Sequence, residues 1–164
     1  KLLPKYPEFG AVLVGKVTAK FERFSTDLQA KVKAAGLEDR IIWLGEVSFD
    51  RIPAVYNAMS FVVAPSRYEG FGLTPLEAMA TGAPVIAADT GAYAAMIEPG
   101  ANGYIFPVDD TNMFQQHLET LMGDPLSIRQ MSNDCQLRVS EHFSIQSEVE
   151  GISDVYHQLW DAES

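Results

Sequence analysis

Five short apolar runs, separated by longer segments of helical periodicity, set the strongest limit on how this chain can fold. The runs are rich in Val and Ile and nearly continuous rather than alternating, which is typical of strands buried on both faces of a parallel sheet. They span Gly10–Val14, Ile41–Leu44, Phe61–Ala64, Val85–Ala88 and Tyr104–Val108. This βαβα rhythm predicts an open, doubly wound α/β fold.

The helical segments change character along the chain. Four are expected between the strands, over Phe21–Ala35, Arg51–Met59, Pro75–Ala80 and Ala92–Ile97. After Pro107 three more follow with no strand between them, over Thr111–Met122, Leu126–Arg138 and Ile145–Trp160. Asp110 or Thr111 can cap the first of these, and Gly123-Asp124-Pro125 stops it. The sequence therefore predicts a helical C-terminal tail, whose last helix has one apolar face.

Composition excludes several classes of function. The 164 residues are typical of one globular domain, and the net charge of −10 comes without the basic stripe of a nucleic-acid binder. An anionic membrane surface would repel such a chain. No run of metal-ligand spacing is present, Asp109-Asp110 fits a strand end and a helix cap better than a metal pair, and no apolar run approaches membrane-spanning length. No metal or other cofactor is expected.

The loop Ser66–Gly72 follows a predicted strand and carries the most informative residues. Gly70 and Gly72 allow a tight turn and a close approach of the backbone to a ligand. Thr74, Pro75 and Glu77 then have the spacing of a capping box, with Thr74 as the N-cap. A helix starting here would direct free amides at the glycine loop, which predicts an anion site.

Two carboxylates bracket this predicted anion site, Glu69 in the loop and Glu77 in the helix. Carboxylates are good acceptors for sugar hydroxyls, so the arrangement suits a ligand with a phosphate group between two sugars. Both residues also have plain structural interpretations. Glu77 would simply cap its helix, and Glu69 would be a solvated loop residue.

The segment Glu69–Glu77, EGFGLTPLE, resembles the E-x7-E motif of glycosyltransferase family 4 and its relatives. The surrounding text matches as well, and the resemblance runs from about Ala11 to about Trp160. It implies a Rossmann-like three-layer α/β/α domain, the nucleotide-sugar-binding C-terminal lobe of a GT-B fold.

The resemblance assigns a role to each matching position. Glu69 would be the catalytic-site residue that binds hydroxyls of the transferred hexose, and Glu77 would bind the ribose. The loop Gly70–Leu73 would hold the donor, with amides near Phe71, Gly72 and Leu73 on the distal phosphate. Val47 would contact the base, and Gly15 would let the backbone pass close to the nucleotide.

Two parts of the family pattern are missing. The strand, helix and basic pair that usually precede this region, G-R-x4-K-G, are absent, so residues 1–164 are expected to be one C-terminal lobe without its first βα unit and without the N-terminal acceptor lobe. The Glu of a G-G-x-x-E segment is also absent, because the chain reads Gly91-Ala92-Tyr93-Ala94-Ala95. The apolar face of the last helix is either a packing face or a face that docks on the missing lobe.

The resemblance implies the donor-binding lobe of a retaining hexosyltransferase. Its partners would be a nucleotide diphosphate sugar, its own N-terminal lobe and a glycan or glycolipid acceptor, in the cytoplasm, with any contact to the inner membrane made through the missing lobe. The tail and the segment Ala88–Gly100 look most like lipopolysaccharide-core mannosyltransferases, which favours GDP-mannose. The alternatives are another GT-B enzyme, such as a nucleotide-sugar epimerase, and a receiver-like α/β signalling domain.

Overall fold

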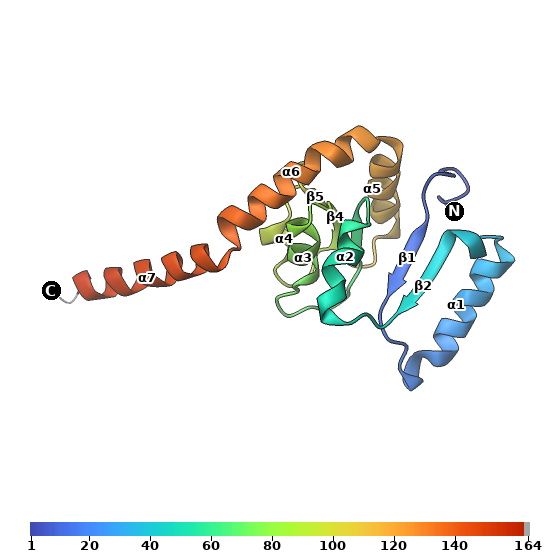
Figure 1. Ribbon diagram of the computed structural model, residues 1–164, viewed down its shortest axis with the longest axis horizontal. Helices are drawn as coiled ribbons and strands as arrows, with labels where there is room; N and C mark the ends of the chain where they lie inside the picture. The colour runs from blue at the N-terminus through green and yellow to red at the C-terminus, as the bar shows by residue number, and fades with distance from the viewer. Residues whose placement is uncertain (163–164) are drawn as a thin grey trace. The chain divides into compact units, whose positions relative to one another are not determined.

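The computed structural model describes residues 1–162 and divides the chain into two compact units, Lys1–Ile52 and Pro53–Ser164. Figure 1 shows the order of the elements within each unit by colour and label. Within residues 1–162 there are five β-strands, all in parallel pairings, and seven α-helices.

The first unit is a single strand–helix–strand motif. β1 (Ala11–Val14) pairs in parallel with β2 (Ile41–Gly45), and α1 (Glu22–Ala34) connects them. Short 3-10 turns, Ala19–Phe21 and Glu38–Arg40, stand at the two ends of α1. The guanidinium group of Arg40 donates hydrogen bonds to the carbonyl of Tyr6 at 2.7 Å and to that of Phe9 at 2.8 Å, which anchors the segment before β1.

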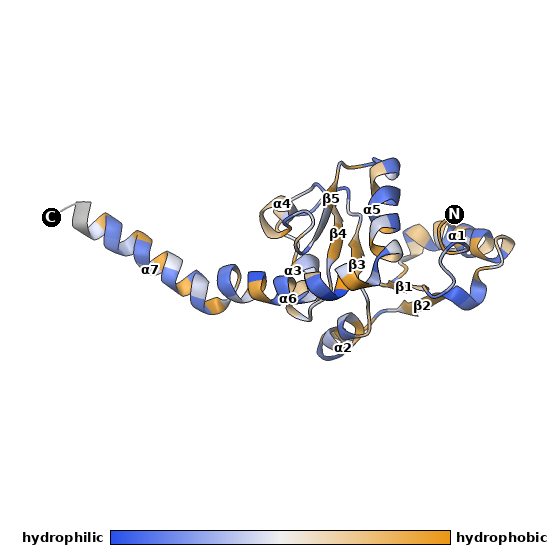
Figure 2. Cartoon of the chain, turned by 90° about the horizontal axis from the view of Figure 1, so that it is seen from above, coloured by the Kyte–Doolittle hydropathy of each residue, from blue (hydrophilic) through white to orange (hydrophobic). Residues whose placement is uncertain are grey.

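The second unit contains a three-stranded parallel sheet with the order β3-β4-β5. Helices lie on both sides of this sheet, with α3 on one side and α5 on the other (Figure 2). Its strands are β3 (Val62–Ala64), β4 (Val85–Ala88) and β5 (Gly103–Phe106). Its helices are α2 (Ile52–Asn57, which begins at the unit boundary after the 3-10 turn Phe49–Arg51), α3 (Thr74–Ala80), α4 (Tyr93–Met96), α5 (Thr111–Gly123), α6 (Pro125–His142) and α7 (Ile145–Ala162).

The core of the second unit is built around β4, whose four residues are all buried. Val85 and Ala87 belong to a buried cluster with residues of β3, α3, α4 and α6. Ile86 and Ala88 alternate with them along the strand, so they face the opposite side of the sheet, where α5 packs on β4 and β5. A strand buried on both faces explains why this run reads as continuously apolar.

Cys135, the single cysteine, lies in the same cluster as a buried thiol on α6. Its Sγ donates a hydrogen bond to the carbonyl of Asn102 at 3.3 Å. Burial, with a smaller contribution from Asp134, raises the pKa of the thiol from 9.0 to about 12. The group therefore acts as a small packing residue.

The predicted α/β class with parallel strands and a helical tail is confirmed, and each predicted strand and helix is present. The strands form two sheets within the described residues rather than one, because β2 pairs with β1 and β3 pairs with β4. Asp110 caps α5 as predicted, accepting hydrogen bonds from the amides of Asn112 and Met113. α6 runs on to His142 instead of ending at Arg138, since no Gly or Pro interrupts it.

The apolar residues of α7 form a stripe on that helix, seen as orange bands among blue in Figure 2. From residue 145 to residue 160, every residue except the half-buried Ser147 is exposed. The stripe comprises Ile145, Val149, Ile152, Val155, Tyr156, Leu159 and Trp160, with exposed fractions between 52% and 82%. Among the helices of residues 1–162, none has the length and apolar character needed to cross a bilayer.

Candidate functional site

The loop that follows β3 forms the rim of the candidate site in the second unit. Parallel strands place the loops after β3, β4 and β5 at one edge of the sheet, and the contacts agree with this. Arg67, in the first of these loops, donates from Nε and Nη2 to Oδ1 of Asp109 after β5, both at 2.8 Å. Gly91, after β4, approaches the backbone of Glu69 and Gly70 so closely that a Cβ there would lie 2.8 Å from the carbonyl oxygen of Gly70.

The two glycines of the loop differ in what they require. Gly72 has a φ of +82°, and an added Cβ would lie 2.3 Å from Cε1 of Tyr93. Gly70 has no atom within 4 Å of the position of a Cβ, and its φ lies outside the left-handed region. Only Gly72 is therefore fixed by backbone conformation and by a close neighbour.

Glu69 is half-buried at this rim. The hydroxyl of Ser66 donates a hydrogen bond to its Oε1 at 2.9 Å, which holds the carboxylate within the loop. Tyr93, the first residue of α4, is fully buried behind the loop. Burial raises the pKa of Tyr93 above 10.0, and the nearby charge of Glu69 adds to this. Glu69 is thus held by the neutral hydroxyl group of Ser66.

Glu77 is also half-buried, and its carboxylate does not take part in the capping box that the sequence predicts. The helix α3 begins at Thr74, as expected, but its N-cap is Leu73 and no side chain caps it. Thr74 is already helical, so the predicted reciprocal pair with Glu77 is wrong. Instead, the hydroxyl of Tyr56 on α2 donates a hydrogen bond to Oε2 of Glu77 at 3.0 Å.

The two tyrosines connect the two glutamates electrostatically. Burial is the largest cause that raises the pKa of Tyr56 to about 12, followed by the hydrogen bond and the charge of Glu77; Tyr93 contributes as well. Tyr93 in turn responds to Glu69 and Ser66. Both phenols therefore keep their protons at neutral pH, and the phenol of Tyr56 donates a hydrogen bond to Glu77.

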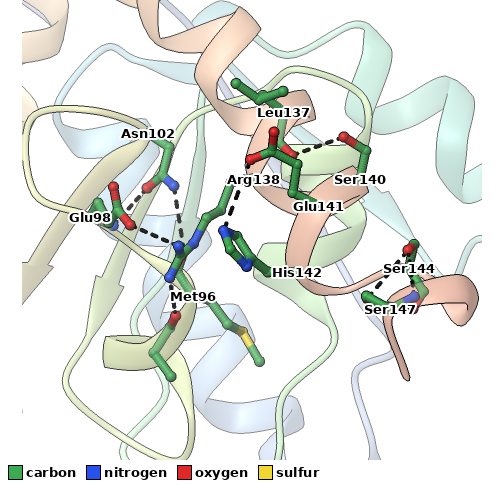
Figure 3. A network of polar contacts seen from close by, with 11 residues as sticks. Met96, Glu98, Asn102, Leu137, Arg138, Ser140, Glu141, His142, Ser144 and Ser147 are labelled. Atoms are coloured by element: carbon green, nitrogen blue, oxygen red, sulfur yellow. Dashed lines mark hydrogen bonds and ion pairs between the residues drawn. The ribbon is translucent and has the colours of Figure 1, made fainter. Parts of the chain in front are cut away.

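Arg138 on α6 is the centre of a polar network that includes residues after α4 (Figure 3). Its Nη2 donates to the carbonyl of Ala95 at 2.9 Å, and its Nη1 pairs with Oε1 of Glu98 at 2.8 Å. Asn102, buried beside them, accepts a hydrogen bond from the amide of Glu98 at 2.8 Å. These contacts tie α4 and the segment after it to α6.

Comparison with known proteins gives this arrangement its family. The family model described as "Glycosyl transferases group 1" matches residues 1–138, which is most of the chain. The chain belongs to the glycosyl transferases group 1 family.

Relatives support the assignment along nearly the whole chain. The lipopolysaccharide core biosynthesis mannosyltransferase LpsB of Rhizobium meliloti (strain 1021) is 40% identical over 160 residues, covering 96% of this chain and 45% of that protein. The C-terminal domain of a glycosyl transferase group 1 family protein (LpcC) from Francisella tularensis is 35% identical with a TM-score of 0.81, over 87% of this chain and 74% of that structure. The chain spans about half the length of the curated relatives it matches.

The structural relatives include a protein that has been solved with ligands. HepE of Anabaena in complex with UDP is 25% identical with a TM-score of 0.81, over 93% of this chain and 42% of that protein. The same protein has also been solved in complex with UDP-glucose, at 25% identity and a TM-score of 0.76 over the same shares. Structural relatives of this transferase domain therefore include a protein that binds a nucleotide sugar.

The residues predicted for the nucleotide in the first unit of the transferase domain lie at the carboxyl ends of its strands. The amide of Gly15 donates to the carbonyl of Gly45 at 2.8 Å, and Val47 is half-buried two residues further on. Lys16, which follows Gly15, pairs with Glu46 at 3.0 Å. In each unit, the predicted site residues thus lie beyond the carboxyl ends of that unit's own strands.

Sequence reasoning missed the hydroxyl donors of the transferase site. Ser66, Tyr56 and Tyr93 contact or face the glutamates, but none belongs to the E-x7-E pattern. The sequence offers only one indication of them, a tyrosine in a short helix on either side of the motif, and such a tyrosine is equally typical of core packing. Within residues 1–162, no group of three or more His, Cys, Asp and Glu side chains could hold a metal ion.

Proposed function

We propose that this chain forms the sugar-donor-binding lobe of a retaining hexosyltransferase, which transfers a sugar from a nucleotide diphosphate sugar to a glycan or glycolipid acceptor. The observation that carries the proposal is the pair of half-buried glutamates, Glu69 and Glu77, each facing a protonated hydroxyl and placed on either side of the loop Gly70–Leu73. The UDP-glucose complex of a structural relative supports the same ligand class.

The donor would lie along the E-x7-E segment, with its hexose at Glu69 and its ribose at Glu77. Amides near Phe71, Gly72 and Leu73 would hold the distal phosphate. Gly15 and Val47 would contact the nucleotide and its base. Breaking the bond between the anomeric carbon and the phosphate oxygen leaves a nucleoside diphosphate, and positioned donors that stabilise its charge are the main catalytic requirement.

Phe71 and Leu73 also have exposed side chains, at 55% and 60%. They alternate with Gly72 along the loop, so apolar surface lies beside the proposed phosphate contacts. Ligand burial there would exclude water and strengthen hydrogen bonds to the phosphate.

Mannose, carried on GDP, is our choice of donor sugar. LpsB, at 40% identity, is named a lipopolysaccharide core biosynthesis mannosyltransferase, and so is LpcC of Rhizobium leguminosarum. The UDP complexes of HepE make UDP-glucose the competing donor. Family membership removes the receiver-like signalling domain from consideration.

The test is a donor screen on the full-length enzyme that contains this chain. GDP-mannose, UDP-glucose and UDP-galactose are incubated with a truncated lipopolysaccharide-core acceptor, and products are analysed by mass spectrometry and by NMR of the anomeric proton. We expect mannosyl transfer from GDP-mannose with retained α-configuration. Transfer from a UDP-sugar alone would overturn the choice of donor, a β-product would overturn retention, and an epimerised donor without transfer would support the epimerase alternative.

A further inference from the structure

Tyr93 combines complete burial with an unsatisfied hydroxyl group. Its side chain has 0% exposure, and its hydroxyl has no hydrogen-bond partner within the described residues. Buried tyrosine hydroxyls usually find a partner, since an unpaired polar group in the interior costs free energy. The unpaired Tyr93 hydroxyl lies at the edge of a proposed ligand site, which indicates that it donates a hydrogen bond in the ligand-bound state.

The phenol of Tyr93 lies directly behind the loop that carries Glu69. A Cβ on Gly72 would be 2.3 Å from Cε1 of Tyr93 and 3.0 Å from its hydroxyl oxygen. The ring therefore touches the loop at the one glycine that the fold requires there. Its hydroxyl also interacts electrostatically with Ser66 and Glu69.

Glu69 is an acceptor that this hydroxyl can serve, since its charge contributes to raising the pKa of Tyr93. Ser66 already fixes Oε1 of the carboxylate at 2.9 Å, from the side of the loop. A carboxylate has about four acceptor positions on its two oxygens, so a second donor is readily accommodated. Tyr93 is the first residue of α4, and Arg138 ties that helix to α6 through the carbonyl of Ala95.

We propose that Tyr93 is a positioning residue for Glu69: its hydroxyl donates a hydrogen bond to the Glu69 carboxylate when a sugar donor fills the site, and so orients that carboxylate toward the hydroxyls of the transferred sugar. The inference rests on the proposed function. It assigns to α4 a part in sugar transfer, in a chain where the Glu of the usual G-G-x-x-E segment is replaced by Ala95.

The test is a double-mutant cycle on the full-length enzyme with Tyr93→Phe, Glu69→Gln and the double variant. Tyr93→Phe removes only the hydroxyl and keeps the ring against Gly72. We expect it to lower kcat about tenfold, the range of one hydrogen bond to a charged group, and to change the Kd for the plain nucleoside diphosphate less than about twofold. In the Glu69→Gln background the same change should lower kcat by less than about twofold.

Two outcomes of this cycle overturn the inference. Equal losses in both backgrounds would mean that Tyr93 acts independently of Glu69, and an unchanged kcat in Tyr93→Phe would mean that the hydroxyl is idle. Tyr56→Phe is the matched control, since it removes the hydroxyl that serves Glu77. Tyr56→Phe should weaken nucleotide affinity, and by the same factor in the wild-type and the Glu69→Gln backgrounds. Melting temperatures of all variants show whether any loss reflects unfolding.

A second measurement separates failure of this inference from failure of the proposed function. In the 164-residue chain, 13C NMR follows the titration of each tyrosine ring. Glu69→Gln should lower the pKa of Tyr93, because the Glu69 charge contributes to raising it, and should leave that of Tyr56 closer to its original value. If Tyr93 does not respond, the inference fails whatever the enzyme does. If it responds but the full-length protein transfers no sugar, the proposed function fails instead.

Discussion

The hydroxyl of Tyr56 and Oε2 of Glu77 lie 3.0 Å apart, joined by a hydrogen bond between α2 and α3. This contact and the start of α3 exclude the capping interpretation of Glu77, and its role toward a ribose stays a prediction. A carboxylate that capped α3 would point back at the start of the helix, and no side chain caps that helix. Glu77 instead faces the second unit's site with one oxygen held by a phenol.

Glu77→Gln should weaken nucleoside diphosphate binding to the full-length enzyme by about ten- to a hundredfold, because a hydrogen bond to a charged group is worth about 1.5–3 kcal/mol. Isothermal titration calorimetry measures this directly. Gln can still accept from Tyr56, so the melting temperature should barely change. Unchanged affinity in the variant would contradict the assignment of Glu77 to the ribose.

Glu69→Gln should reduce sugar transfer and leave the affinity for the plain nucleoside diphosphate nearly unchanged, because that ligand has no hexose to reach Glu69. The measurements are kcat with the sugar donor and calorimetry with the diphosphate. If this variant weakened diphosphate binding as much as Glu77→Gln, then one glutamate could not be assigned to each sugar.

Gly72→Ala should lower the free energy of unfolding by about 2–4 kcal/mol, because it combines a left-handed backbone conformation with a clash against the Tyr93 ring. Gly70→Ala is the matched control two residues away. It meets no atom within 4 Å, so we expect a change within about 0.5 kcal/mol. Urea denaturation of the 164-residue chain compares the two, and equal effects would mean that the loop is not seated on Tyr93.

Stability should fall as pH rises from 10 to about 12, and Tyr56 should be one cause. Its pKa is 10.0 in an unfolded chain and about 12 in the fold, so in this window the unfolded state loses its proton first and is favoured. Below pH 10 the contribution is fully present. Denaturation of wild type and Tyr56→Phe across pH 9–12 tests this, and we expect a shallower decline in the variant; parallel curves would be the contrary result.

The 164-residue chain by itself should transfer no sugar, because catalysis needs an acceptor lobe and the exclusion of water from the reacting groups. A radiolabelled donor assay with the purified chain checks this, using the full-length enzyme as the positive control. Measurable turnover by the chain alone would show that the chemistry does not need a second lobe.

Most of the fold could be predicted because burial leaves a direct trace in the sequence. Val85–Ala88 is continuously apolar since both of its faces are covered, and the Asp110 cap could be recognised from its position before a helical run. The end of α6 was harder to place, because Val139–His142 holds no helix breaker and only the packing decides where the helix stops. Apolar runs likewise do not specify which strands pair, and here β2 pairs with β1 while β3 pairs with β4.

The site could be predicted only in outline. The E-x7-E spacing pointed to Glu69 and Glu77, but Tyr56 and Tyr93, which interact with these carboxylates, lie far from them in sequence; only Ser66 is in the same loop as Glu69. The capping-box prediction was wrong because Thr74 is the first helical residue of α3 and not its N-cap. Glu77 accepts a hydrogen bond from Tyr56 instead. Spacing along one helix cannot show what a neighbouring helix offers.

The buried thiol of Cys135 has a practical consequence for following ligand binding. With its pKa raised to about 12 and no exposure, this group should not react with maleimide reagents near neutral pH. A single cysteine introduced at Tyr68, which is 87% exposed beside Glu69, would therefore carry a fluorophore alone, with no need to replace the native cysteine. Such a label would report the arrival of a ligand beside Glu69 as a change in fluorescence.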